Sequence, residues 1–247
     1  MKLGRIEPKY LSKSNPRIGL ITLASDFRIE KDFANVIYGK EIDLFSNRIH
    51  CYNPLTNKTL KKMADDITDV TKEILPDQKL DCVAYGCTSG TIAAGYTSIF
   101  DKVNLAKPNT KVTTPITSAI KALKKLNINK ISIFTPYTDE INQSVAEYFK
   151  KENIEVISLT YFDIESDLDI GKVDPDYLFD VLSKIDLSKS DALFVSCTAL
   201  PVLSLIDQLE KKLGKIVLSS NQALIWDPLK EINYNKSIDG FGQLYKD

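Results

Sequence analysis

The chain repeats one short pattern in each of its halves: an aspartate, an apolar run, a small residue and then Cys-Thr. The first copy spans 81–88 and contains Cys87, and the second spans 191–198 and contains Cys197, so the two cysteines are 197 − 87 = 110 residues apart. A nearly continuous apolar run is typical of a buried strand, which would present each thiol at its C-terminal end. Two such ends can face each other across one cleft and reach both faces of a small molecule.

The duplication extends beyond the cysteines. Residues 17–22 and 130–135 are both apolar runs that end in Thr, at an offset of 130 − 17 = 113, and an aspartate follows each at the same distance. A weaker third match aligns Thr114 with Ser220, at an offset of 220 − 114 = 106. The common order and the slowly changing offset favour a repeated architecture.

Apolar runs alternate with amphipathic stretches along the chain. Strands are expected at 17–23, 45–51, 81–86, 110–113, 130–134, 154–159, 191–196 and 215–219. Helices are expected in the gaps, among them 60–75, 117–126, 139–153 and 201–213, where apolar residues recur every three or four positions. Gly214 is the expected C-cap of the last of these. Such alternation predicts parallel sheets joined by right-handed crossovers.

Eight strands in two repeated sets of four predict an α/β protein. We expect two pseudo-symmetric, doubly wound lobes, each with a four-stranded and mainly parallel sheet, and an active site in the cleft between them. The first lobe is placed at 1–113 plus 221–247 and the second at 114–220, because too little chain follows residue 220 to build anything except a return to the first lobe. A chain of 247 residues can bury a core of this size.

Composition excludes several classes of partner. The 32 basic and 33 acidic residues give no charge bias towards nucleic acid or an anionic membrane, and no apolar run approaches a membrane span. The N-terminus lacks the apolar core of a signal peptide, and four cysteines without framework spacing suggest reduced thiols in a cytoplasm. No cysteine or histidine spacing suits a metal, and no glycine-rich nucleotide loop is present, so no cofactor is expected.

The two cysteines are the candidate reactive groups. Each is followed by a turn into a helix, whose free N–H groups and partial positive charge should lower the pKa of the thiol. With the hydroxyls of Thr88, Ser89 and Thr198, those N–H groups can hold a carboxylate or an enediolate oxygen. The sequence leaves open the alternative of a non-catalytic protein that binds a small acid, in which Cys87 and Cys197 are small buried apolar residues.

The segments around the cysteines, 83–91 and 196–200, resemble the two cysteine motifs of the aspartate/glutamate racemase superfamily. The resemblance covers roughly residues 17–242 and is closer to the branch that holds maleate cis-trans isomerases, arylmalonate decarboxylases and ectoine-utilisation proteins. Three further segments are similar to that branch: 113–117, 135–138 and 220–223.

The resemblance implies a cofactor-independent enzyme that acts on a small carboxylate or amino acid between two lobes. It implies that Cys87 and Cys197 are the catalytic pair. The substrate-binding positions that it implies are Asp26, Thr88, Ser89, Tyr137, Asp167 and Thr198. It implies no metal, and it leaves assembly into a homo-oligomer open.

Asp26 departs from the pattern of the maleate isomerases, which are expected to carry Asn at that position. An ionised Asp accepts hydrogen bonds but cannot donate them, so it would repel a substrate carboxylate and orient a cationic amino group. The position therefore favours an amino acid over maleate.

Three reactions fit this site. Racemisation needs a base on one face of a carbon acid and an acid on the other, which a thiolate and a thiol supply. Cis-trans isomerisation needs a thiolate that adds to a double bond and leaves after rotation, while the second thiol manages the proton. Decarboxylation needs only one cysteine, and the decarboxylases of this branch lack the first. Racemase and isomerase therefore remain the expected activities, with an arylmalonate-type decarboxylase as the alternative.

Overall fold

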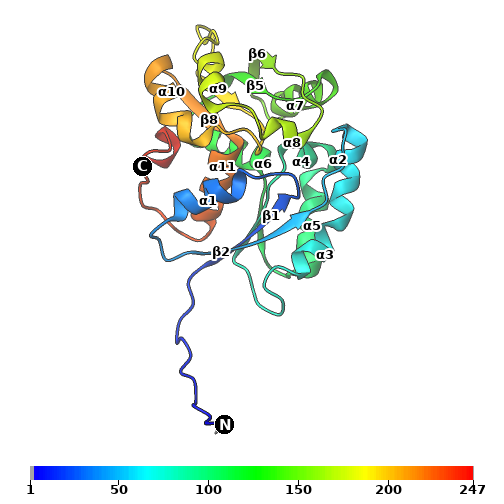
Figure 1. Cartoon of the computed structure of the whole chain (residues 1–247). Helices are drawn as coiled ribbons and strands as arrows, with labels where there is room; N and C mark the ends of the chain where they lie inside the picture. The colour runs from blue at the N-terminus through cyan, green and yellow to red at the C-terminus, as the bar shows by residue number, and fades with distance from the viewer. Residues whose placement is uncertain (1–2, 247) are drawn as a thin grey trace.

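The structure is a computed structural model that describes residues 3–246. It contains two four-stranded sheets in which every paired strand is parallel (Figure 1). The first has the order β2-β1-β3-β4, from β1 (Arg17–Leu23), β2 (Asp43–Ile49), β3 (Cys82–Tyr85) and β4 (Lys111–Thr113). The second has the order β6-β5-β7-β8, from β5 (Lys130–Thr135), β6 (Glu155–Tyr161), β7 (Ala192–Val195) and β8 (Ile216–Ser219). The predicted α/β fold with two repeated four-stranded sheets is confirmed.

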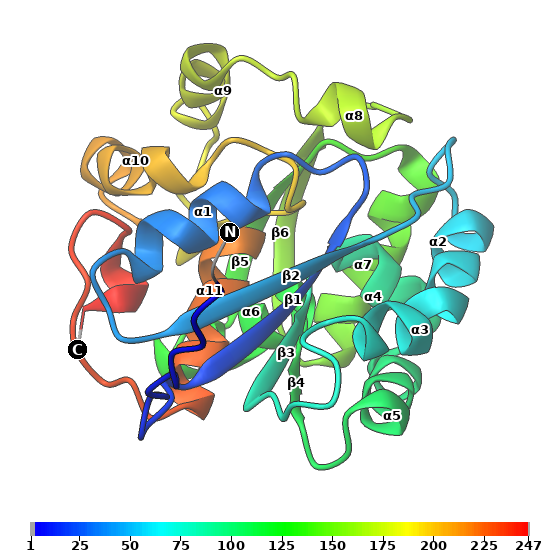
Figure 2. The same cartoon turned by 60° about the horizontal axis from the view of Figure 1, so that its bottom comes forward.

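Helices connect the strands and cover the sheets. They are α1 (Ile29–Ile37), α2 (Asn57–Met63), α3 (Ile67–Lys72), α4 (Thr88–Ala94), α5 (Tyr96–Ala106), α6 (Pro115–Lys125), α7 (Asp139–Lys151), α8 (Asp167–Ile170), α9 (Pro175–Leu182), α10 (Ile206–Leu213) and α11 (Ser220–Glu231). Figure 2 shows the first sheet with α2, α3 and α5 to one side and α1 and α11 to the other. Both faces of this sheet are therefore covered, which explains why β3 is apolar at every position. The equivalent strand of the second sheet, β7, is likewise apolar and buried throughout.

The registers of the two sheets repeat each other. Ile18 pairs with Cys82 in the first sheet, and Ile131 pairs with Ala192 in the second, which reproduces the offsets of 131 − 18 = 113 and 192 − 82 = 110. The third match was wrong by one residue. Thr114 caps α6, and the residue that caps α11 in the same way is Ser219 rather than Ser220.

Two predicted helices are interrupted by tighter turns. The stretch predicted as one helix over 60–75 forms α2, a 3₁₀ turn at Ala64–Asp66, and α3, which ends at Lys72. The stretch predicted over 201–213 starts with a 3₁₀ turn at Leu203–Leu205 before α10, and Gly214 closes α10 in the left-handed conformation as expected. Periodicity locates the apolar face of such segments, but it does not distinguish a 3₁₀ turn from an α-helical turn.

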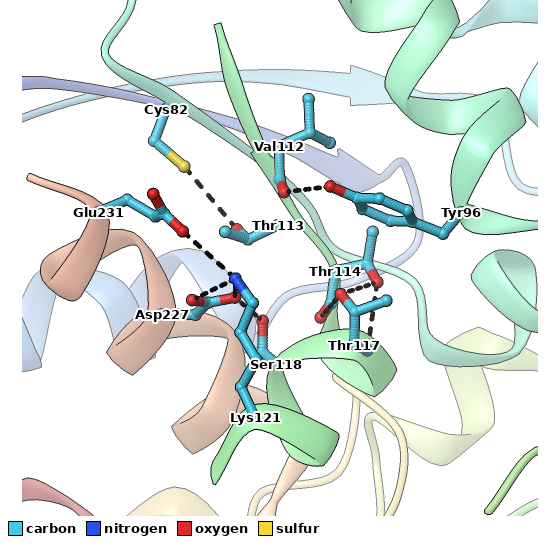
Figure 3. Close-up of polar contacts among 10 residues, drawn as sticks. All are labelled: Cys82, Tyr96, Val112, Thr113, Thr114, Thr117, Ser118, Lys121, Asp227 and Glu231. Carbon is cyan, nitrogen blue, oxygen red and sulfur yellow. Dashed lines mark hydrogen bonds and ion pairs between the residues drawn. The ribbon is translucent and has the colours of Figure 1, made fainter. Parts of the chain in front are cut away.

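Helices α6 and α11 bring the two halves of the chain together. They pack against each other, and α11 also packs against β3 and β4 of the first sheet although it follows β8 of the second. A buried polar cluster lies between them, in which the carboxylate of Asp227 accepts hydrogen bonds from Ser118 Oγ (2.8 Å) and Lys121 Nζ (2.9 Å) (Figure 3). The lobe limits of 1–113 plus 221–247 and 114–220 stay a prediction.

Among residues 3–246, none of the helices is both long enough and apolar enough to cross a membrane.

Candidate active site

The two repeated cysteines line the same enclosed cavity. Cys87 follows β3 and Cys197 follows β7, and their side chains are 3% and 4% exposed. The cavity is small, and its apolar wall is formed by leucines 23, 55 and 60. Seven of the eight residues predicted for the site line it: Cys87, Thr88, Ser89, Tyr137, Asp167, Cys197 and Thr198.

The backbone holds the two cysteine loops in equivalent ways at their start. Gly86 N–H donates to Ile21 O (2.7 Å) beyond β3, and Ser196 N–H donates to Phe134 O (2.8 Å) beyond β7. The loops then diverge, because Cys197 has a φ of +92°. A residue with a side chain seldom adopts that conformation, and such strain persists only where surrounding contacts hold it.

Cys87 is the N-cap of α4. Its Sγ accepts a hydrogen bond from Gly90 N–H at 3.2 Å, so the predicted contact between thiol and helix N-terminus is present. The expected lowering of its pKa is nevertheless wrong. Burial raises the pKa of the Cys87 thiol, and the Gly90 N–H only partly opposes that rise. The pKa of Cys197 is likewise raised, first by burial and then by the nearby charge of Asp167.

The hydroxyls beside the cysteines connect the two loops. Thr198 Oγ1 donates to Gly86 O (3.1 Å), which ties the second loop to the first. Thr88 Oγ1 lies 2.8 Å from Ser220 Oγ, and Ser220 Oγ accepts from Cys197 N–H (3.0 Å). Both threonines predicted to bind substrate therefore also hold the cysteine loops against each other.

Asp167 places a carboxyl group at the cavity. It is 2% exposed and accepts a hydrogen bond from Ser25 Oγ at 2.6 Å. Burial is the main cause that raises its pKa to about 6, and the charge of Asp26 acts in the same direction, while the Ser25 hydroxyl opposes it. Near neutral pH this carboxyl group is thus close to the point at which it changes charge.

Asp26 is buried near the cavity but does not line it. Its Oδ1 accepts from the N–H groups of Arg28 (2.7 Å) and Ile29 (3.1 Å), while its Oδ2 has no hydrogen-bond partner within residues 3–246. Burial raises the pKa of Asp26. This predicted substrate-binding residue is therefore absent from the cavity wall, but it contacts Thr198 and its charge acts on Cys197 and Asp167.

Tyr137 is buried at the second cysteine. Its hydroxyl oxygen accepts from Ser196 Oγ at 3.4 Å, and its main-chain carbonyl accepts from Asn142 Nδ2 at 3.0 Å. The ring is therefore fixed beside Cys197, and contact with the Tyr137 hydroxyl partly opposes the rise in the pKa of that thiol.

Several polar neighbours of the site were not predicted. Asn221 Nδ2 donates to Thr198 O (2.9 Å) and to Asp32 Oδ2 (2.6 Å), and burial raises the pKa of Asp32 to about 7. Ser25 and Ser220 were also missed. Only the segment 220–223 was singled out, through its resemblance, and nothing local in the sequence showed that its side chains reach the cysteine loops.

No group of histidine, cysteine or carboxylate side chains in the described part of the chain is arranged to hold a metal ion. The arrangement instead offers two thiols, several hydroxyls and a carboxyl group around one small cavity. Such a site can add a thiolate to a substrate, or it can move a proton between the two faces of the substrate.

Fold and site define a class of protein: a duplicated α/β structure with a pair of buried cysteines at one cavity. The chain belongs to the arylmalonate decarboxylase family, whose model matches residues 32–245.

Three similar proteins are maleate isomerases. A maleate isomerase of Geobacillus stearothermophilus is 28% identical over 243 residues, which cover 92% of this chain and 96% of that protein. The crystal structure of the maleate isomerase Iso from Pseudomonas putida S16 has a TM-score of 0.86 at 22% identity, covering 94% of this chain and 98% of that chain. The structure of a Nocardia farcinica maleate cis-trans isomerase mutant with a covalently bound succinylcysteine intermediate also has a TM-score of 0.86. It is 20% identical and covers 95% of this chain and 100% of that chain.

Proposed function

We propose that this protein is a cofactor-independent cis-trans isomerase of a small unsaturated carboxylate, with maleate as the first substrate to test. The observation that carries the proposal is the convergence of Cys87 and Cys197 on one enclosed cavity. The similarity to maleate isomerases over nine-tenths of the chain supports it. Two thiols supply both groups that the chemistry needs, a nucleophile and a proton donor.

The proposed reaction starts with Cys87 as thiolate and Cys197 as thiol. The Cys87 sulfur adds to one carbon of the double bond, and the neighbouring carbon takes the proton of Cys197. Rotation about the resulting single bond follows. Cys197, now a thiolate, takes a proton back from that carbon, the double bond forms again in the trans geometry, and the carbon–sulfur bond breaks to release the Cys87 thiolate.

Cys87 is the better placed nucleophile. As the N-cap of α4, its sulfur accepts the Gly90 N–H, a contact that stabilises negative charge on sulfur. The Cys197 sulfur also meets a backbone N–H, that of Ala199, but it does not cap a helix. Cys197 lies beside the hydroxyl of Tyr137, a contact that favours the thiolate left after Cys197 has given up its proton. The substrate carboxylates would be bound by the hydroxyls of Thr88 and Ser89.

A protonated Asp167 fits this reaction. Because its pKa is raised to about 6, the carboxyl group can carry a proton in mildly acidic solution and donate it in a hydrogen bond to a substrate carboxylate. The pKa of Asp26 is also raised, which likewise favours its protonated form. A protonated Asp26 can donate a hydrogen bond, as the Asn expected at this position in maleate isomerases can.

Racemisation of an amino acid is the second candidate. Neither Asp26 nor Asp167 forms an ion pair with a cationic side chain within residues 3–246. When ionised, the two carboxylates would attract a substrate ammonium group to the side of Cys197. Cys87 and Cys197 would then exchange a proton with opposite faces of the α-carbon.

The experiment is proton NMR of the purified protein in deuterium oxide with a panel of maleate, aspartate, glutamate, a diaminobutyrate derivative and an arylmalonate. Conversion of maleate to fumarate supports the isomerase. Loss of an α-proton signal from an amino acid supports the racemase, and loss of carbon dioxide from the arylmalonate would support a decarboxylase. No reaction, together with slow alkylation of all four cysteines, would favour a protein that only binds a small acid.

The proposal extends to where the protein acts and how it assembles. Thiolate chemistry requires reduced cysteines, and all four cysteines are free thiols, which suits the cytoplasm.

Assembly into a homo-oligomer is proposed because large apolar side chains near the N-terminus, including Leu3, Ile6 and Leu11, are exposed and a second copy can cover them. Light scattering with and without residues 1–14 tests this.

A further inference from the structure

Ser220 joins the two cysteine loops through a single oxygen atom. It is the first residue of α11, is fully buried, and lies outside both cysteine motifs. Its Oγ accepts a hydrogen bond from Cys197 N–H at 3.0 Å and lies 2.8 Å from Thr88 Oγ1. One hydroxyl thus contacts the backbone of one reactive cysteine and the side chain that follows the other.

Either hydroxyl can donate in the bond that joins Ser220 and Thr88. A serine hydroxyl has one proton to donate. Within residues 3–246 neither hydroxyl donates to any other acceptor, so a substrate carboxylate that accepts from Thr88 leaves Ser220 as the donor between them. With Ser220 as the donor to Thr88, the proton of the Thr88 hydroxyl is left free to point into the cavity that Thr88 lines.

The second contact acts on the backbone of Cys197. With its φ of +92°, Cys197 has a strained conformation that its surroundings must hold. Ser220 supplies the acceptor for its main-chain N–H. Without that acceptor the N–H would be buried and unpaired, so the loop would move to find another partner.

We propose that Ser220 is a positioning residue of the active site. Its hydroxyl holds the Cys197 loop in its strained conformation and orients the Thr88 hydroxyl so that Thr88 donates to a substrate carboxylate. The hydrogen bonds from Cys197 N–H to Ser220 and from Ser220 to Thr88 also couple the two cysteine loops, so that substrate binding at one loop affects the position of the other. The part of this inference that concerns substrate rests on the proposed function, whereas the part that concerns Cys197 does not.

The test compares Ser220→Ala with Ser219→Ala. Ser219 is the adjacent residue of the same type, and its hydroxyl caps α11 by accepting from Gln222 N–H (3.1 Å) without contacting either cysteine loop. Both variants lose one buried hydroxyl near the start of α11. Only Ser220→Ala is expected to change the site, so Ser219→Ala separates a positioning role from loss of helix stability.

Two readouts are expected to move in Ser220→Ala, and a third, measured in a Thr88→Val background, is expected to change little. The rate at which iodoacetamide alkylates Cys197, mapped by mass spectrometry, should rise at least fivefold relative to that of Cys87, because the loop loses its anchor. The KM for maleate should rise about tenfold, the effect of one lost hydrogen bond to a charged group. In a Thr88→Val background, Ser220→Ala should raise KM by less than twofold, because Thr88 is already unable to donate.

Two results would overturn the proposal. The first is an unchanged ratio of Cys197 to Cys87 alkylation in Ser220→Ala, and the second is a rise in KM that Ser219→Ala matches. If the wild-type protein does not convert maleate, the proposed function fails. The alkylation ratio, which needs no substrate, then still decides the role of Ser220 at Cys197.

Discussion

At the scale of single residues, Gly90 shows how closely the first cysteine is surrounded. A Cβ at this position would lie 2.8 Å from Cys87 Sγ, 2.9 Å from the hydroxyl oxygen of Tyr85 and 3.0 Å from Cε of Met63. Gly90→Ala should therefore displace the thiol and lower the free energy of unfolding by about 1–3 kcal/mol, the usual cost of overpacking. Activity should fall at least tenfold. Steady-state kinetics and urea denaturation check both effects, and a variant with wild-type values would show that the pocket around the thiol is looser than described.

Asp167 gives a prediction of pH dependence. Its pKa of about 6 means that it is protonated, and able to donate to a carboxylate, only below that pH. The KM for maleate should therefore rise as the pH increases from about 5 to 8, because the ionised carboxylate repels the substrate. Asp167→Asn should remove this rise, since an amide donates at every pH.

Asp169→Asn is the matched control for Asp167→Asn. Asp169 lies on the same short helix α8 but is exposed and paired with Lys172 (2.7 Å), so its variant should keep the wild-type pH profile. An unaltered pH profile in Asp167→Asn would remove Asp167 from the substrate site.

Sequence and structure agree at this scale where the signal is local. Cys87, Thr88 and Ser89 were identified as site candidates because they directly follow a buried strand, and the same holds for Cys197 and Thr198. Ser220 was not, because its contact with Thr88 joins residues 132 positions apart in the sequence. The pKa of the thiols was also predicted in the wrong direction, because the sequence shows the helix N-terminus but not the burial that outweighs it.

At the scale of elements, the contact between α6 and α11 depends on a buried carboxylate. Asp227 is 2% exposed, and Lys121 is the only cation paired with it within residues 3–246. Lys121→Ala should lower the free energy of unfolding at pH 7 by about 1–2 kcal/mol, because Asp227 loses a charged hydrogen-bond donor while buried.

Lys124→Ala provides the control for Lys121→Ala in urea denaturation. Lys124 lies on the same helix, with a more exposed pair to Glu152 (3.4 Å), and surface pairs of this kind contribute less than about 1 kcal/mol. Equal losses in the two variants would mean that the buried cluster contributes nothing specific to the contact between α6 and α11.

The elements themselves were predicted with uneven success. All eight strands were located, each within two residues of its ends. The signal is clearest for β3 and β7, because strands covered on both faces are continuous apolar runs. Helix α1 was not delimited, although Ile29, Phe33 and Val36 repeat at helical spacing and are buried, so periodicity contained the signal.

At the scale of the whole molecule, the raised carboxyl pKa values make stability depend on pH. Burial raises the pKa of Asp32 to about 7 and that of Asp167 to about 6, from an ordinary value of 3.8. Between about pH 4 and 7 the folded protein therefore holds protons that the unfolded chain has released. The free energy of unfolding of the unliganded protein should increase as the pH falls from 7.5 to 5.

Urea denaturation at several pH values checks this dependence. Asp32→Asn and Asp167→Asn should each flatten it, because an amide does not titrate. Carboxylates whose pKa is lowered, such as Asp69 and Asp186, act only below about pH 4 and leave this range unaffected. Stability that increases with pH over the same range would contradict the assignment of buried, protonated carboxyl groups.

The two halves of the duplicated fold differ at their cysteines. Equivalent strand ends present Cys87 and Cys197, yet only Cys87 caps a helix and only Cys197 has the strained backbone. The proposed reaction uses this difference, with one sulfur bonding to carbon and the other managing the proton.

The most direct test is to trap the covalent intermediate. Cys197→Ala is incubated with maleate, and the adduct is mapped by intact-mass and peptide mass spectrometry. Without the Cys197 thiol, the added substrate takes a proton from water and cannot readily return it, so one substrate molecule should accumulate on Cys87. Cys87→Ala should show no adduct and no turnover. An adduct on another residue, or undiminished conversion of maleate by Cys87→Ala, would contradict the two-cysteine account.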